Sequence, residues 1–421
     1  MHAFVSHRGS SSTRLAQAFA LVWLLGCTAL IATPVQGQAT ETRTAVADKV
    51  AKALSARLEQ LVESGEVPGA SAAVILPDGT QVTATAGYAD KETKEPMTAE
   101  HRLFAGSIGK THFAALAVDL LQTGKLKLED PVSKYLGKTD WYGKLPNADK
   151  LTIAHLMRHQ SGLPRYVLQQ QIWQDLLADP DKVFTAGERV AYVFDMPAVH
   201  EPGEGWAYSD TNYIVLGAVI GNILNEEMDE AIEDAIDGTV YDSVVERILQ
   251  PHQLADTVTG DKREIEGLAQ GYDVLFRGLG MPERMVKDGK FAINPQFEWC
   301  GGGFVTTPLD LARWARLNYT GQLFKHDYLA LMQKDAATAD PRMGGELHYG
   351  LGVMIRQTPQ GKLLGHDGVF PGYVSSMGYF PEQEIAAAIQ INTDNGRALG
   401  MPSYAFLAEL VQIAKEAQTA K

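Results

Sequence analysis

The chain has 421 residues, of which 37 are Lys or Arg and 51 are Asp or Glu, so its formal net charge at pH 7 is −14. Hydrophobic residues make up 45% and charged residues 21%, a globular composition that excludes long disorder, and the acidic balance excludes nucleic acid or an anionic membrane surface as an electrostatic partner. The two cysteines, Cys27 and Cys300, exclude a disulfide framework and a zinc site built on cysteines.

The N-terminus has the pattern of an export signal. Residues 1–14 carry two arginines and no acid, residues 15–32 are almost wholly apolar, and small residues follow. This order predicts a secretory signal peptide over residues 1–37, and therefore a secreted or periplasmic protein with no stable membrane insertion after cleavage. Two alternatives stay open: an uncleaved membrane anchor, and a lipid anchor at Cys27, where the sequence Leu-Leu-Gly-Cys resembles a lipobox.

Hydrophobic spacing predicts helices and strands in a definite order along the rest of the chain. The part from residue 125 to residue 300 is expected to be mostly helical. The other expected elements are a helix over 43–63, a β-hairpin over 70–76 and 81–88, a helix from Gly106 to Gly124, strands over 348–356, 362–365, 373–380 and 384–392, and a closing helix over 402–416.

These elements predict an α/β (α+β) fold, in which an antiparallel sheet flanked by helices is joined to a mostly helical second domain. The strands near the two ends are expected to join into one sheet. The α/β domain would then be discontinuous, with residues 42–135 and 300–421, and residues 136–299 would form the helical domain. Functional sites usually lie at such a junction between domains.

The first chemical motif lies where a loop enters the helix after Gly106. Ser107-Ile-Gly-Lys110 is the only Ser-x-x-Lys sequence in the chain, and a spacing of three places both side chains on one helical face. A serine hydroxyl needs a neighbouring base to act as a nucleophile, and a lysine in a partly buried cleft can serve. The segment is neither a P-loop nor a Gly-x-Ser-x-Gly elbow, because Phe104 and Ala105 stand where those motifs need glycine. Taken alone, the motif also fits a serine that caps a helix and a lysine on the surface.

Two further motifs follow along the chain. Tyr208-Ser-Asp210 precedes an apolar run, and His366-Asp-Gly368 lies between two strand-like runs. By itself, such a tyrosine is usually a packing residue, and such a histidine is usually a turn residue.

Together, in this order and spacing, the three motifs resemble those of the serine β-lactamase and penicillin-binding-protein superfamily. The match is closest to its class C-like branch, which includes D-alanyl-D-alanine carboxypeptidases, D-aminopeptidases and esterases, with the motifs Ser-x-x-Lys, Tyr-x-Asn and Lys/His-x-Gly. The stretches at 151–164, 201–203 and 301–312 are also similar to stretches of the family, and the resemblance covers about residues 45–415. His155 and His159 have a spacing that suits zinc, but no glutamate follows the first histidine, and neither a metal nor an organic cofactor is expected.

The resemblance implies a mechanism for the motif residues. Ser107 would attack a carbonyl and form an acyl-enzyme, while Lys110 and Tyr208 would share the proton that leaves Ser107. Which of the two is the base stays open. The backbone N–H groups of Ser107 and of Val369, directly after Gly368, would form the oxyanion hole.

The second motif departs from the family pattern at Asp210, where the family has asparagine. An ionised carboxylate has no hydrogen-bond donor to offer a substrate carbonyl. It would also favour the protonated form of Lys110, because an opposite charge stabilises the ammonium, and this shifts weight to Tyr208 as the base.

The third motif departs from the pattern of the β-lactam-binding members at two positions. His366 stands in place of lysine and is expected to line the opposite wall of the cleft and to tune its charge. Asp367 stands in place of threonine or serine, and the loss of a fixed cation together with an added acid would disfavour a substrate carboxylate. The alternative is that Asp367 points into a turn and never meets substrate.

These features predict a secreted acyl-serine hydrolase for an ester or amide in a small molecule or short peptide, such as an esterase or a D-amino-acid-peptide hydrolase. A β-lactamase or a D-Ala-D-Ala carboxypeptidase is the alternative. A non-catalytic binding or sensor protein on the same fold is the alternative from another class, and Asp210 keeps it open.

Overall fold

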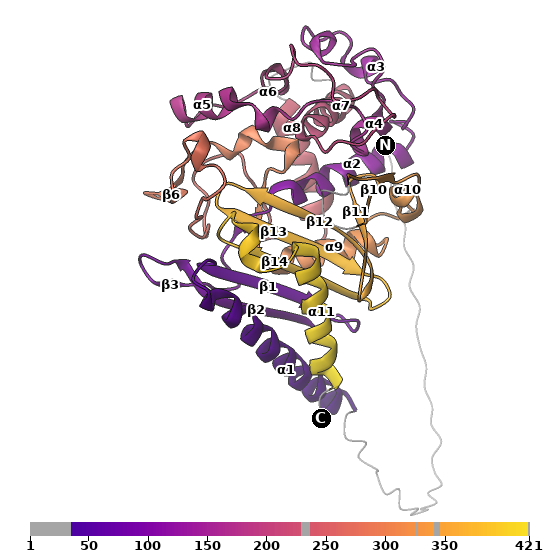
Figure 1. Ribbon diagram of the computed structural model, residues 1–421. Helices are drawn as coiled ribbons and strands as arrows, with labels where there is room; N and C mark the ends of the chain where they lie inside the picture. The colour runs from indigo at the N-terminus through magenta and orange to yellow at the C-terminus, as the bar shows by residue number, and fades with distance from the viewer. Residues whose placement is uncertain (1–34, 229–235, 326, 341–345, 420–421) are drawn as a thin grey trace, which may run out of the picture. The chain divides into compact units, whose positions relative to one another are not determined.

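An antiparallel sheet forms the centre of the fold (Figure 1). Within the residues that the structure describes, nine strands run in the order β3-β2-β1-β14-β13-β12-β11-β10-β9, and neighbouring strands are antiparallel. The N-terminal hairpin therefore pairs with the last strand of the chain, with Ala72 opposite Ile389. The strands are β1 (Gly69–Ile75), β2 (Gln81–Asp90), β3 (Glu95–Pro96), β9 (Ala337–Thr338), β10 (Leu347–Tyr349), β11 (Met354–Thr358), β12 (Gly361–Phe370), β13 (Tyr373–Phe380) and β14 (Ile385–Ile391).

This computed structural model describes residues 35–228, 236–325, 327–340 and 346–419. Apart from residues 35–37, the signal peptide expected over 1–37 lies outside these ranges, as does Cys27, so export and lipid attachment stay predictions. The chain divides into two units, Met1–Thr42 and Arg43–Lys421, and the sheet and the three motifs belong to the second unit. Among the helices so described, none combines the length and the apolar character that a membrane span requires.

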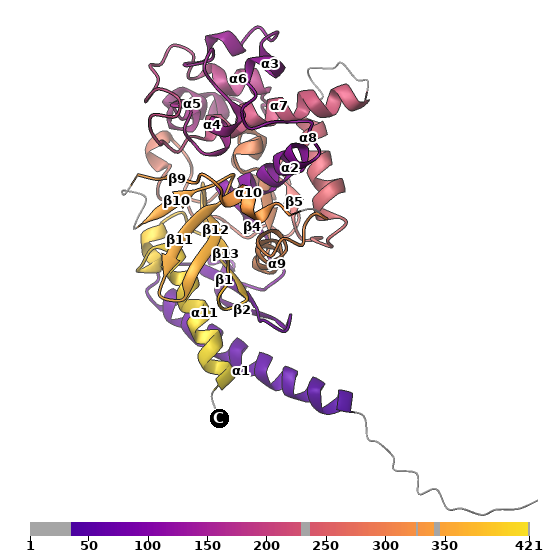
Figure 2. The ribbon, with the colours of Figure 1, turned by 90° about the vertical axis from the view of Figure 1, so that its right-hand side faces the viewer.

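Two helices from opposite ends of the chain pack on one face of the sheet, the first of them through its residues after Thr42 (Figures 1 and 2). These are α1 (Val35–Glu63) and α11 (Ser403–Thr419). Leu54 of α1 and Phe406 of α11 belong to one buried core with side chains of β1, β2 and β14. The helical backbone of α1 begins at Val35, before the expected residue 43. The prediction rested on apolar spacing, which the residues before 43 lack.

The other face of the sheet carries α9 (Pro308–Tyr319), which packs on β1, β13 and β14, and the helical part of the chain. A continuous core of buried side chains joins this face to the helices, and Tyr213–Ile220 of α7 are buried on every side. The remaining elements are α2 (Lys110–Gln122), α3 (Ser133–Leu136), α4 (Ile153–Met157), α5 (Gln170–Ala178), α6 (Ala186–Ala191), α7 (Asp210–Met228), α8 (Ile236–Val244), α10 (Leu329–Gln333), and the short strands β4 (Leu103–Phe104), β5 (Val258–Thr259), β6 (Val286–Lys287), β7 (Lys290–Phe291) and β8 (Phe304–Thr306).

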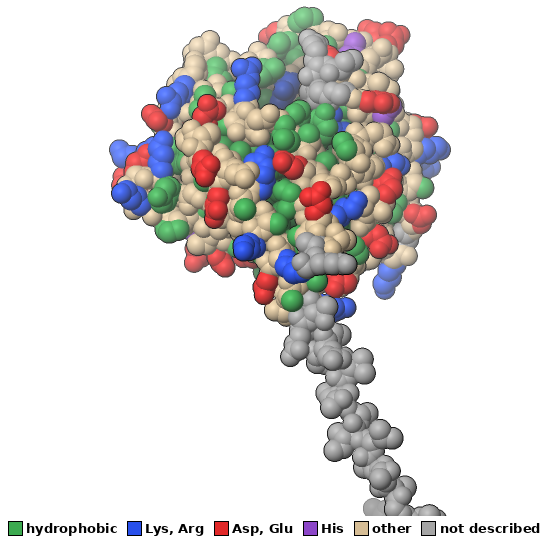
Figure 3. All heavy atoms as spheres, turned by 60° about the horizontal axis from the view of Figure 1, so that its bottom comes forward, with side chains coloured by type: hydrophobic (Ala, Val, Ile, Leu, Met, Phe, Trp, Pro, Cys, Tyr) green, Lys and Arg blue, Asp and Glu red, His purple; other side chains and the backbone are tan. Residues whose placement is uncertain are grey.

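The expected fold class is confirmed, with helices on both faces of an antiparallel sheet. The division into a domain of residues 42–135 and 300–421 and a domain of residues 136–299 stays a prediction. On the molecular face in Figure 3, acidic, basic and hydrophobic side chains are interspersed rather than gathered by kind.

Two strands differ from those expected. The run over 348–356 is broken into β10 and β11, where Gly352 takes a left-handed conformation with φ of +69°. In contrast, β12 continues through the third motif, with His366 opposite Met377 of β13. The motif is therefore part of a strand, and the interpretation of His366 as a turn residue is wrong.

Candidate active site

Ser107 and Lys110 lie where the sheet meets the helices. Ser107 belongs to the short helix η1 (Gly106–Gly109), and Lys110 is the first residue of α2. Lys110 Nζ donates a hydrogen bond of 2.9 Å to Ser107 Oγ, and the Lys110 side chain is fully buried. The structure therefore brings the expected nucleophile and its lysine into contact on one helical face, as their spacing requires.

Glycines let η1 approach strand β12 closely. Gly106 has φ of +54°, and a Cβ there would lie 2.8 Å from Val369 N. A Cβ on Gly368 would lie 1.9 Å from the Ala105 carbonyl oxygen and 3.1 Å from Ser107 N. The Val369 backbone is thus held against the segment that carries Ser107. An oxyanion hole made of these two amides needs this placement, and that role stays a prediction.

Asp210, the first residue of α7, lies between two cations. Lys110 Nζ donates to Asp210 Oδ1 at 2.7 Å and also to the carbonyl oxygen of Gly301. Arg165 Nε donates a hydrogen bond of 2.9 Å to Asp210 Oδ2, and the ion pair between the two residues brings a terminal guanidinium nitrogen within 2.7 Å of the same oxygen. Burial acts to raise the pKa of the Asp210 carboxyl, but Arg165 and Lys110 outweigh it and hold that pKa well below its usual range.

Lys110 is accordingly held as an ammonium. Burial alone would lower its pKa, but the Asp210 carboxylate reverses this effect and the net pKa is raised. This direction agrees with the expectation that Asp210 favours protonated Lys110. The sequence analysis did not single out Arg165. What could have pointed to it is its position directly after Ser-Gly-Leu-Pro, a stretch similar to one of the family.

The Tyr208 ring lies close to both cations. Lys110 Nζ is 5.1 Å from the ring centroid and Arg165 Cζ is 5.3 Å from it. Burial raises the pKa of the Tyr208 phenol, and the Lys110 charge opposes the rise. Among the described residues, the Tyr208 hydroxyl has no hydrogen-bond partner of normal geometry. Ser107 still lies near enough to this hydroxyl to lower the pKa of the Tyr208 phenol. Ser107, Lys110 and Tyr208 are thus gathered at one point.

A buried histidine fixes the segment that carries Tyr208. His159 Nδ1 accepts hydrogen bonds from Ser209 N at 3.2 Å and from Asn212 Nδ2 at 2.9 Å, so the ring proton is on Nε2. Burial and the charge on Lys110 hold the pKa of His159 well below its usual range. His159 is therefore a neutral acceptor that positions the second motif.

His366 is buried and neutral. Its Nδ1 donates to the Asp367 carbonyl oxygen at 2.6 Å, so its Nε2 accepts from the Tyr349 hydroxyl at 2.9 Å. Burial lowers the pKa of His366 to about 3. The ring lies near the site, with its centroid 6.3 Å from that of Tyr208. His366 therefore brings no positive charge to the cleft at neutral pH, in keeping with the expected loss of a fixed cation, and its role at the wall of the cleft stays a prediction.

Asp367 points to the face of the sheet opposite Ser107. Because side chains alternate along a strand and Gly368 faces η1, the neighbouring Asp367 faces the α11 side. There it accepts a hydrogen bond of 2.5 Å from Ser376 Oγ and lines a small cavity with Arg356. The expectation that this acid disfavours a substrate carboxylate is wrong. The alternative is wrong about a turn, because Asp367 pairs with Ser376 inside the sheet, but it agrees with the structure in that Asp367 does not face Ser107.

A second buried acid, Glu298, lies beside the cluster, and sequence reasoning missed it. Glu298 is 6% exposed, and no described residue provides a hydrogen-bond partner for its Oε2. Burial raises its pKa to about 8, a rise that Lys110 opposes and Asp210 adds to. Glu298 therefore carries a proton at neutral pH. In the sequence it is an acid between two aromatic residues, with the first of three consecutive glycines three positions later.

Glu298→Gln is expected to flatten the pH dependence of stability. Folded Glu298 keeps its proton up to a pKa of about 8, whereas the unfolded carboxyl loses it near the usual 4.5, so the free energy of unfolding falls as pH rises through this window. The glutamine amide stays neutral throughout. Urea unfolding at pH 5 and pH 8 should show that the free energy of unfolding of the variant, relative to that of the wild type, is higher at pH 8 than at pH 5. An equal difference at both pH values would show that Glu298 is ionised in the folded protein.

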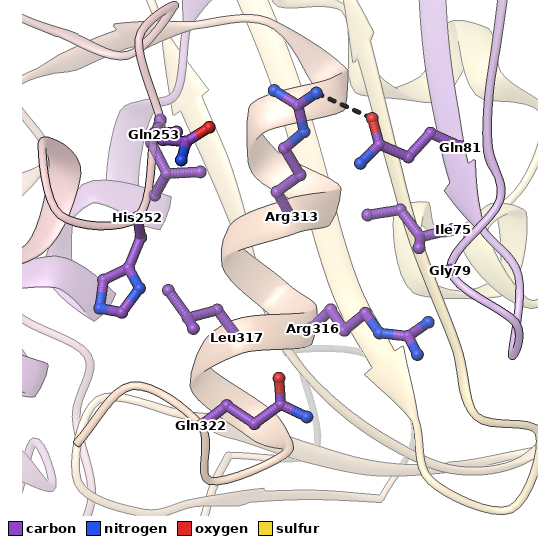
Figure 4. Close-up of a pocket in the computed structure, with 10 residues that line it drawn as sticks. Ile75, Gly79, Gln81, His252, Gln253, Arg313, Arg316, Leu317 and Gln322 are labelled. Carbon is purple, nitrogen blue, oxygen red and sulfur yellow. Dashed lines mark hydrogen bonds between the residues drawn. The ribbon is translucent and has the colours of Figure 1, made fainter. Parts of the chain in front are cut away.

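A separate cavity of about 470 Å³ lies between the β1–β2 hairpin and α9 (Figure 4). Its two arginines already have protein partners. Arg313 donates to Gln81 at 2.8 Å, and Arg316 donates to the carbonyl oxygens of Leu76 and Pro77. We assign no ligand to this cavity. Among the residues that the structure describes, no group of three or more His, Cys, Asp or Glu is placed to hold a metal ion.

Known proteins are similar in sequence over most of this chain. The sequence profile of the family described as Beta-lactamase matches residues 54–410. Penicillin-binding protein 4* of Bacillus subtilis (strain 168) is 26% identical over 304 residues, which cover 69% of this chain and 60% of that protein. D-aminopeptidase of Brucella anthropi is 23% identical over 353 residues, which cover 82% of this chain and 60% of that protein. The chain thus spans about 60% of the length of these curated relatives.

Solved structures share the fold. The D-amino acid amidase from Ochrobactrum anthropi SV3, complexed with L-phenylalanine amide, has a TM-score of 0.70 and 26% identity, and the match covers 87% of this chain and 98% of that one. A D-stereospecific amidohydrolase from Streptomyces sp. has a TM-score of 0.70 and 24% identity, over 88% of this chain and 99% of that one. The second likeness shows the fold alone.

Proposed function

Since this chain belongs to the Beta-lactamase family, we propose that it is a serine hydrolase that cleaves an amide or ester bond through an acyl-enzyme on Ser107. One observation carries the proposal: the buried Lys110 amine lies 2.9 Å from Ser107 Oγ and 5.1 Å from the centroid of the Tyr208 ring. A serine becomes a nucleophile when a neighbouring group takes its proton. The Lys110 ammonium and the Tyr208 phenol both carry a proton at rest, and either can take that of Ser107 after releasing its own.

The proposed reaction has two halves. The reactive form is the one in which the pair of Lys110 and Tyr208 has released one proton to solvent. Ser107 Oγ attacks the substrate carbonyl carbon, its proton passes to this pair, and the backbone amides of Ser107 and Val369 bind the oxyanion. The leaving amine or alcohol departs with that proton, which leaves an ester on Ser107. Water then attacks this ester, the same pair takes a proton from the water and returns one to Ser107, and the free acid leaves.

D-Amino-acid amides or short D-peptides are the substrates that we propose. A D-aminopeptidase among the relatives and a D-amino acid amidase among the structures support this class. The neutral state of His366 supports it further, because this position offers no cation to the carboxylate of a β-lactam. We also propose that the protein is exported, which the pattern of residues 1–37 alone supports.

A substrate panel tests this proposal. We expect kcat/KM for a D-phenylalanine amide to exceed that for the L-enantiomer by at least about 10-fold, since one misplaced group in a fitted site costs roughly that much. The panel includes p-nitrophenyl acetate for an esterase and nitrocefin for a β-lactamase, with Ser107→Ala as the blank. A preference for nitrocefin would instead assign a β-lactamase. Binding of these compounds without turnover would assign a sensor and overturn the proposal.

A further inference from the structure

One carboxylate near the nucleophile serves two cations. Asp210 holds Lys110 through Oδ1 at 2.7 Å and Arg165 through Oδ2 at 2.7 Å. The Lys110 side chain is 0% exposed and that of Asp210 is 3% exposed, whereas that of Arg165 is 35% exposed. The charge on Asp210 is therefore divided between a lysine that contacts Ser107 and an arginine at the edge of the site.

Lys110, Asp210 and Arg165 depend on one another electrostatically. Without Asp210, the charges of Lys110 and Arg165 would face the Tyr208 ring with no counter-charge, and burial would drive Lys110 to lose its proton. Without Arg165, Lys110 would be the one charged partner left to the buried Asp210 carboxylate among the described residues. The carboxylate would then hold the Lys110 ammonium more tightly. The family's asparagine at this position would need no such arginine.

We propose that Arg165 is a positioning residue, which acts on Ser107 through Asp210: its guanidinium fixes the carboxylate against Lys110 and offsets part of its charge. Arg165 thereby sets how readily the Lys110 amine exchanges its proton when Ser107 reacts. This inference rests on the proposed function, because it concerns the reactivity of Ser107.

Other groups around Lys110 shape its titration but do not replace this pair. The neighbouring histidines are neutral, since burial lowers the pKa of each, and the buried glutamate carries a proton at neutral pH. The titratable groups that face Lys110 are Asp210 and Tyr213 of α7, Tyr208 before it, Arg165 before α5, Glu298 before β8, His159 after α4 and His366 of β12.

The test is the rate at which a fluorophosphonate labels Ser107, measured from pH 5 to pH 10 in four proteins: the wild type, Arg165→Gln, Asp210→Asn and the double variant. In Asp210→Asn, Lys110 loses its counter-charge, so the midpoint of the pH profile should fall by about one unit. In Arg165→Gln, Lys110 loses a like charge and keeps its carboxylate, so the midpoint should rise. A purely structural role of Arg165 would leave the midpoint of Arg165→Gln where the wild type has it.

The double variant measures the coupling between Arg165 and Asp210. Arg165→Gln should slow labelling at pH 7.5 by at least about 10-fold, because its midpoint rises, whereas the lower midpoint of Asp210→Asn should not slow it. Made in Asp210→Asn, the change Arg165→Gln should slow labelling at least about 5-fold less than it does in the wild type, because the carboxylate through which Arg165 acts is gone. Arg284→Gln is the matched control, because Arg284 pairs with Asp90 at the same 2.7 Å on the surface and should leave the profile unchanged.

The outcomes separate this inference from the proposed function. Single effects that multiply in the double variant, or an unmoved midpoint in Arg165→Gln, would overturn the role of Arg165 while the wild type still reacts. A wild type that fluorophosphonate does not label at all would overturn the proposed function itself, and the inference with it.

Discussion

Replacing Ser107 with alanine is expected to lower kcat/KM for the best substrate by at least about 10³-fold and to abolish covalent labelling, since no comparable nucleophile remains to form the acyl-enzyme. The fold should survive, because the Ser107 hydroxyl accepts one hydrogen bond, from a Lys110 amine that keeps Asp210 and the Gly301 carbonyl as partners. Steady-state kinetics, fluorophosphonate labelling and a thermal melt measure the three effects.

Ser133→Ala is the control for this change, because Ser133 is an exposed serine at the start of α3. It should match the wild type in labelling and in turnover. Residual turnover by Ser107→Ala within about 10-fold of the wild type would contradict the nucleophile assignment, because the loss of a covalent nucleophile has far larger effects.

Lys110→Met is expected to slow acylation by at least about 10³-fold as well, since the methionine keeps the apolar stem but removes the group that exchanges a proton with Ser107. It should also lower the melting temperature. Asp210 would be left buried with Arg165 as its single charged partner among the described residues, and breaking a buried pair is costly.

Stopped-flow labelling and a thermal melt separate the two effects of Lys110→Met. In Asp210→Asn/Lys110→Met, the carboxylate that lost Lys110 is gone, so the melting temperature should recover while acylation stays slow. Acylation of Lys110→Met at a rate within about 10-fold of the wild type would show that Lys110 stabilises the site without handling the proton.

Local spacing explains what could be predicted. Ser107 and Lys110 are three residues apart at a helix start, so their contact follows from helix geometry and needs no knowledge of the rest of the fold. The pairing of the N-terminal hairpin with the C-terminal strands followed from the strand patterns at the two ends, and β1 does pair with β14. The fold class was predictable for the same reason.

Strand register and tertiary contact explain what was missed. A side chain in β12 changes face with each residue, so the motif alone did not show that Gly368 faces η1 while Asp367 faces α11. Arg165 and Lys110 meet the same carboxylate from positions 45 and 100 residues away along the chain. No local pattern encodes such a meeting, and the partners of Asp210 needed the folded structure.

Peptide mapping of a trapped intermediate is the most direct test of an acyl-enzyme on Ser107. The protein is incubated with a D-phenylalanine ester, quenched in acid during turnover, and digested for mass spectrometry. The proposed mechanism predicts one adduct, of the mass of the D-phenylalanyl group, on the peptide that contains Ser107, and its absence in Ser107→Ala. An adduct on another residue, or steady turnover with no adduct on Ser107 at any quench time, would contradict it.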